Sequence, residues 1–184
     1  MSYLDEIEPA VTALLEIIIT ETERYVGAME EFQETAQALN QSKEITEKDE
    51  NSTPYDIINY IKYTFKVVEN AKKIKGESLP ALCGALLQIA RQGIGTLKGA
   101  QGRIVVDYED YGPVCLRNYI WYARNQAMHY ESKFHGPTAE MLPKIFNRPL
   151  ELCHNQNLSL FAINDLGWTK FSDFANDLKE LGVE

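Results

Sequence analysis

The sequence has few cysteines and few histidines, three of each. The cysteines, Cys83, Cys115 and Cys153, are widely spaced and form no CxxC pair. A disulfide framework or a cysteine zinc site is therefore not expected, and a reducing compartment is the plainer interpretation. No other ligand spacing typical of a metal site is present, so we predict neither a metal nor a cofactor.

Features of secreted and membrane-spanning proteins are also lacking. The first residues, MSYLDEIEPA, carry acids where a secretory signal needs bases. The apolar patch at 14–19 is interrupted by Glu16 and is far too short to cross a bilayer. We expect a cytoplasmic protein that has no membrane partner.

Basic residues are in the minority. The 18 lysines and arginines face 27 acids, which gives a net charge of −9. This balance argues against a general nucleic-acid coat protein, although it is compatible with a local basic cleft. The length of 184 residues suits one domain with a core of its own.

Apolar residues recur at spacings of three and four, which is typical of helices. We predict an all-α, up-down four-helix bundle with a long N-terminal helix and extra C-terminal helices. The predicted bundle covers residues 1–136, and 137–184 form a helical extension packed on the same domain. The predicted main helices cover about 3–39, 54–76, 78–97 and 112–135, and further helices cover about 140–146 and 168–181.

Three segments carry more detailed expectations. The first helix either overhangs its domain as one long rod or is kinked near Gly27. The polar stretch 40–54 is predicted to be an exposed loop, and 103–106 a short extended piece. The lysines of the second predicted helix form either a basic patch for RNA or, more commonly, a solvated face.

The fourth predicted helix contains the one constellation that indicates chemistry, Arg124-Asn125-Gln126-Ala127-Met128-His129. Asn125 and His129 are four residues apart and share a helix face, and the long side chain of Arg124 can reach toward the same place. Histidine exchanges protons near neutral pH, and arginine offers a charged fork that matches a phosphate. This set suits metal-free cleavage of RNA, in which the 2′-hydroxyl serves as the internal nucleophile.

The segment ARNQAMHYE resembles the R-[N/D/H]-x3-H motif of the HEPN superfamily. Those proteins are helical bundles, commonly dimers, whose two motifs meet across the interface and form a metal-independent endoribonuclease site. The resemblance implies that Arg124 binds and polarises the phosphate, that His129 is the acid–base group and that Asn125 assists. One toxin branch has a tyrosine two residues after the histidine, whereas this chain has Glu131 there and its tyrosine at Tyr130.

The resemblance implies an RNA substrate, 2′,3′-cyclic phosphate ends, a homodimer and a role as a toxin, in defence or in RNA processing. An antitoxin or regulatory protein is a further possible partner. Arg117, two turns before Arg124, and Tyr130 are weaker candidates for contacts with phosphate or RNA. The alternative from another class is a non-catalytic HEPN-like module that binds a ligand or a protein and in which Arg124 and His129 are structural.

Overall fold

The computed structural model describes residues 1–46, 54–95, 97, 99–110, 112–153 and 156–184. These residues are mainly helical, as predicted, and include one two-stranded antiparallel sheet. The elements are α1 (Tyr3–Thr46), α2 (Pro54–Lys73), the π-helical turn η1 (Ile74–Ser78), α3 (Leu79–Gly93), β1 (Ile104–Tyr108), β2 (Gly112–Cys115), α4 (Leu116–His129), α5 (Gly136–Phe146), the 3-10 turn η2 (Leu150–Cys153), α6 (Ser159–Leu166) and α7 (Phe171–Glu180). No helix among the described residues is both long enough and apolar enough to cross a membrane.

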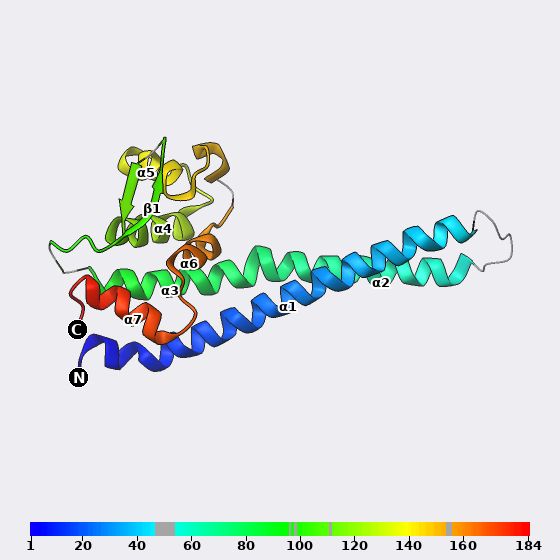
Figure 1. Ribbon diagram of the computed structural model, residues 1–184, viewed down its shortest axis with the longest axis horizontal. Coiled ribbons are helices and arrows are strands. Elements are labelled where there is room, and N and C mark those ends of the chain that lie inside the picture. Colours follow the sequence, from blue (N-terminus) through cyan, green and yellow to red (C-terminus); the bar gives the residue numbers. More distant parts are fainter. Residues whose placement is uncertain (47–53, 96, 98, 111, 154–155) are drawn as a thin grey trace. The chain divides into compact units, whose positions relative to one another are not determined.

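The chain forms two compact units. The first contains Met1–Ile19 and Leu79–Glu184, and the second contains Thr20–Ser78. In the first unit α3, α4 and α6 contact one another, while α5 packs on α4 and α7 packs on α3 (Figure 1). The helices that follow residue 136 therefore share a core with α3 and α4.

The core of the first unit is built from the apolar faces of α3 and α4. Their fully buried side chains include Leu79, Cys83, Leu86, Leu87, Leu116, Tyr119, Ile120 and Ala123. The start of α1 is tied to this unit at two points. The Tyr3 hydroxyl donates to the Ile89 carbonyl at 2.7 Å, and the Tyr3 amide donates to the Glu184 carbonyl at 2.8 Å.

The predicted start of the fourth helix was wrong. Residues 112–115 form β2, which pairs with β1 in an antiparallel hairpin, and α4 begins only at Leu116. The first amides of α4 are satisfied by the preceding chain, because Leu116 donates to the Arg103 carbonyl and Arg117 to the Gln101 carbonyl. The predicted extended piece at 103–106 is confirmed over 104–106, which belong to β1, and β1 provides the pairing that the sequence pattern did not reveal.

The predicted end of that helix was also wrong. Helix α4 ends at His129, and Gly136 and Pro137 begin α5 instead of stopping α4. Proline fits the first turn of a helix because its missing amide has no intrahelical partner there. Gly136 has φ of +56°, a left-handed value that favours glycine.

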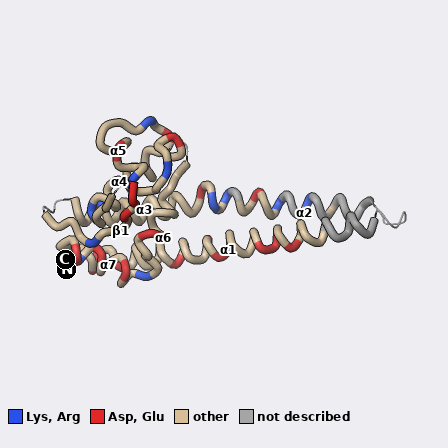
Figure 2. Tube along the Cα trace, turned by 45° about the horizontal axis from the view of Figure 1, so that its top comes forward, with Lys and Arg blue, Asp and Glu red and all other residues tan. Residues whose placement is uncertain are grey.

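The second unit contains the later part of α1 together with α2 and η1. Helix α1 runs through Gly27 without interruption, and its helical backbone continues over residues 40–46, where a loop was predicted. Residues 47–53 of that predicted loop lie outside the described part of the chain. The Tyr63 hydroxyl donates to Glu31, and the Lys75 ammonium lies over the Tyr25 ring at 5.2 Å. Acidic residues recur along α1 and lysines along α2 (Figure 2).

Candidate functional site

Helix α4 divides into a buried face and an accessible face. The buried face carries Leu116, Tyr119, Ile120, Ala123, Gln126 and Ala127. The predicted site residues lie on the remaining surface, where Arg124 and Asn125 are half-buried and His129 is exposed. All members of the motif except Gln126 and Ala127 are therefore outside the core.

Arg124 and Asn125 are brought together. The Arg124 Nη1 donates to the Asn125 Oδ1 at 3.2 Å, and the Arg124 Nε donates to the Gln88 Oε1 on α3 at 2.5 Å. These acceptors are neutral, and none of the ion pairs among the described residues involves Arg124. The guanidinium is thus oriented by two amides while its charge is not neutralised by a carboxylate.

His129 is the last residue of α4 and stands apart from this pair. Within the described part of the chain its side chain has no hydrogen-bond partner or ion pair, while its carbonyl accepts from the Ser132 amide at 2.8 Å. Five helical positions correspond to a rotation of about 140° around the helix axis from Arg124. One chain therefore presents an oriented arginine and an accessible histidine at separate positions on α4.

The two weaker candidates have local partners. Arg117 is half-buried, and its Nη2 donates to the Leu97 carbonyl at 2.5 Å. Tyr130 follows the end of α4, and the neighbouring carboxylate of Glu131 raises the pKa of its hydroxyl, with a smaller contribution from burial. Arg117 lies on the same side of α4 as Arg124, two turns away.

The sequence interpretation missed Arg91. Its guanidinium lies over the Trp121 ring with 3.2 Å between the guanidinium carbon and the ring centroid, which joins α3 to α4. Burial lowers the pKa of Arg91, and the positive charges of Arg124 and Arg117 lower it further. The available signal was the presence of an arginine within the predicted third helix, but sequence spacing does not show which aromatic ring it meets.

Gln126, inside the motif, was also missed. It is fully buried, and its Nε2 donates to the carbonyls of Cys153 and Gln156 at 3.0 and 2.6 Å. Its Oε1 accepts from the Leu158 amide at 2.9 Å. A glutamine on an otherwise apolar helix face demands such partners, because an unpaired buried amide is costly. Gln126 thus fastens the segment before α6 to α4 and fixes the helix that carries the motif.

Outside the motif, the reactive side chains of Cys83 and Tyr119 are buried in the core. The three cysteines are free, and burial raises the pKa of the Cys83 thiol to about 12. The Tyr119 hydroxyl donates to Asp165 at 2.5 Å, and burial followed by this carboxylate raises its pKa. Among the described residues no group of three or more histidines, cysteines or acids is arranged to hold a metal ion.

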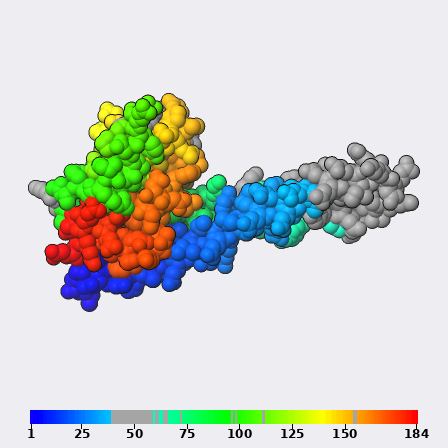
Figure 3. Space-filling model, viewed as in Figure 1, coloured from blue at the N-terminus to red at the C-terminus, as the bar shows by residue number. Residues whose placement is uncertain are grey.

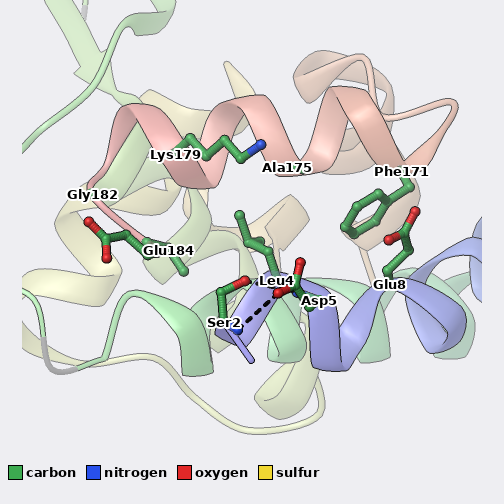
Figure 4. A pocket seen from close by; sticks show the side chains of 10 residues that line it. Ser2, Leu4, Asp5, Glu8, Phe171, Ala175, Lys179, Gly182 and Glu184 are labelled. Atoms are coloured by element: carbon green, nitrogen blue, oxygen red, sulfur yellow. Dashed lines mark hydrogen bonds between the residues drawn. The ribbon is translucent and has the colours of Figure 1, made fainter.

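A pocket of about 560 Å³ lies elsewhere in the first unit, between the start of α1 and α7. Figure 3 shows α7 and the last residues beside the first turns of α1. Asp5 and Glu8 come from α1 and Lys179 comes from α7, and the Ser2 amide donates to Asp5 at 3.0 Å (Figure 4). No residue of the motif lines this pocket.

The predicted site is therefore assembled in part within one chain, as an Arg124–Asn125 pair on α4 with His129 accessible at the helix end. Comparisons of the chain with protein-family models, with curated proteins and with solved structures find no match.

Proposed function

We propose that this protein is a metal-independent endoribonuclease of the HEPN type that uses Arg124, His129 and Asn125. The observation that carries the proposal is the placement of the motif on α4. Arg124 is oriented by amides and has no carboxylate partner among the described residues, and His129 is accessible to a substrate.

The nucleophile of the reaction is the 2′-hydroxyl of the RNA substrate itself. The 2′-hydroxyl of one ribose loses its proton and attacks the adjacent phosphorus, while the bond to the 5′-oxygen of the next nucleotide breaks. The products are a 2′,3′-cyclic phosphate and a 5′-hydroxyl that has gained a proton. His129 moves protons in this reaction, Arg124 stabilises the negative charge on the phosphate, and Asn125 holds the guanidinium in place.

Two copies of the chain form the complete site in this proposal. The rotation of about 140° between Arg124 and His129 makes it difficult for one helix to bring both to a single phosphate. A two-fold pairing of α4 helices would place Arg124 of one copy near His129 of the other. The bundle order of the main helices and the cytoplasmic location are expectations from the sequence pattern. The homodimer and a toxin, defence or RNA-processing role with an antitoxin or regulator follow only from the resemblance to HEPN proteins.

Two observations favour the alternative, a non-catalytic module that binds a ligand or a protein. Both acceptors of Arg124, Gln88 and Asn125, belong to its own subunit, and such bonds would also serve a purely structural arginine. The net charge of −9 also suits a protein that meets partners other than nucleic acid. Cleavage assays separate the two functions.

The decisive assay incubates a mixed RNA pool with the purified protein in EDTA and sequences new ends that carry a cyclic phosphate. Wild-type protein is expected to produce such ends, and Arg124→Ala and His129→Ala are expected to lose them. His135→Ala is the matched control, because His135 is also exposed and lies just beyond α4. Absence of cleavage by the folded wild-type protein, freed of any antitoxin, would favour the binding module.

A further inference from the structure

Three arginines of the first unit form a row across α3 and α4. Arg117 and Arg124 are separated by two turns of α4, about 10 Å along its axis. Trp121 lies between them on the same side of the helix, and the Arg91 guanidinium is stacked on its ring at 3.2 Å. We call Arg91, Arg117 and Arg124 the arginine row.

The charge of the arginine row is not neutralised within the described residues. The ion pairs found there join Arg24 to Glu21 and Arg103 to Asp177, and neither pair involves the row. Arg117 donates instead to the Leu97 carbonyl and Arg124 to the amide oxygens of Gln88 and Asn125. Three like charges held this close repel one another, and a bound polyanion relieves that repulsion.

The neighbours of the row hold its guanidiniums in fixed planes. The Arg91 guanidinium lies over the Trp121 ring, and the Gln88 amide orients Arg124. Guanidinium groups match phosphate oxygens in geometry, and nucleic-acid bases stack on guanidinium planes. The separation of about 10 Å between Arg117 and Arg124 along α4 lets these two side chains reach neighbouring phosphates of one strand.

We propose that the arginine row binds consecutive backbone phosphates of single-stranded RNA, with a base stacked near the Arg91–Trp121 pair. This inference rests on the proposed ribonuclease function and deepens it, because it places the strand along α4, the helix that ends at His129. A single strand is favoured over a duplex because only unpaired bases can stack on a protein side chain.

The test measures binding without cleavage. A fluorescently labelled 2′-O-methyl RNA oligonucleotide lacks the attacking hydroxyl, and its anisotropy is titrated with the full chain over a range of salt concentrations. Arg91→Gln and Arg117→Gln should each weaken binding about ten-fold. Each should also reduce the slope of log affinity against log salt by about 0.7, the share of one phosphate contact on a single strand.

Arg148→Gln is the matched control, since Arg148 lies over the Phe161 ring at 4.6 Å in the same unit but outside the row. It should leave both affinity and slope unchanged. Arg91→Lys keeps the charge but loses the guanidinium plane, so it should weaken affinity while retaining the slope. This variant also provides a second measurement if Arg91→Gln does not fold, as judged by circular dichroism and thermal melting.

Unchanged affinity and slope in folded Arg91→Gln and Arg117→Gln would overturn the inference. So would an equal loss in Arg148→Gln, or no binding by the wild-type chain. His129→Ala separates this inference from the proposed function, because it should bind as the wild type does but cleave RNA far more slowly. If the wild type binds RNA and the variants of the arginine row bind it less tightly, but the wild type cleaves no RNA, only the ribonuclease proposal fails. If the wild type cleaves RNA and the variants of the arginine row bind it as tightly as the wild type does, only the proposed role of the arginine row fails.

Discussion

Gln126 and Arg124 are two residues apart on α4, yet their polar groups are used differently. Gln126 is fully buried, and both ends of its amide are bonded to backbone groups of the segment before α6. Arg124 is half-buried and bonded to two amides, but its charge has no carboxylate partner among the described residues. Gln126 therefore stabilises the fold, whereas the charge of Arg124 remains available to a ligand.

The largest effect is expected for His129 on the accessible side. His129→Ala should lower the rate of RNA cleavage by about 10² to 10⁴, the usual contribution of a positioned acid or base. Its thermal midpoint should remain that of the wild type, because the imidazole is exposed and has no described side-chain partner. If His129→Ala instead lowered the thermal midpoint and left the rate of RNA cleavage unchanged, His129 would be a structural residue and not a catalytic one.

The next largest effect is expected for Gln126 on the buried side. Gln126→Leu keeps the approximate volume but leaves two carbonyls and one amide without partners, so we expect a loss of about 3 kcal/mol in the free energy of unfolding. Urea denaturation measures it. Gln88→Leu is the informative comparison, because it removes a half-buried acceptor of Arg124 and should cost clearly less.

A smaller effect is expected at the start of α7. The Asp173 carboxylate accepts from the Thr169 hydroxyl and amide and from the Lys170 amide, and these bonds lower its pKa, the hydroxyl contributing most. Asp173→Ala should lose about 1 kcal/mol of stability at neutral pH. A depressed pKa stabilises the fold above the unfolded value of roughly 4 and loses that contribution as the pH falls through the folded value. The difference between wild type and variant should therefore shrink in acid, as measured by chemical denaturation at several pH values.

The smallest effect concerns the cysteines and leaves stability unchanged. Cys115 is half-buried, whereas Cys83 and Cys153 are buried and burial raises the pKa of both thiols. Because the thiolate is the reactive form, brief treatment with iodoacetamide should modify Cys115 first. Peptide mass spectrometry identifies the modified residue, and preferential labelling of Cys83 would contradict the described core.

The helical character of the fold was predictable, because apolar residues recur at spacings of three and four in the sequences of α2, α3, α4 and α7. The boundaries of α4 were not. Pro113 looked like a helix start, but the antiparallel pairing of Asp107 with Pro113 and of Ile104 with Cys115 made it part of a strand. That pairing joins neighbouring segments in a hairpin, and a search for helical periodicity does not reveal a hairpin.

For the candidate site, too, some features could be predicted from the sequence and others could not. Arg124, Asn125 and His129 could be selected from residue type and spacing, and the contact between Arg124 and Asn125 follows from their adjacency. The partnership of Arg91 with Trp121 depends on how α3 packs against α4, so no spacing within either helix predicts it. The role of Gln126 likewise depends on a segment about thirty residues further along the chain.

The most direct test of the central claim mixes two inactive variants. If Arg124 of one copy acts with His129 of another, Arg124→Ala and His129→Ala are each inactive alone. After co-refolding in equal amounts they should recover roughly a quarter of the wild-type cleavage in EDTA, because half of the dimers then contain one intact site out of two. Full activity in either single variant would contradict the assignment of the motif, and a mixture as inactive as its components would contradict the two-copy site.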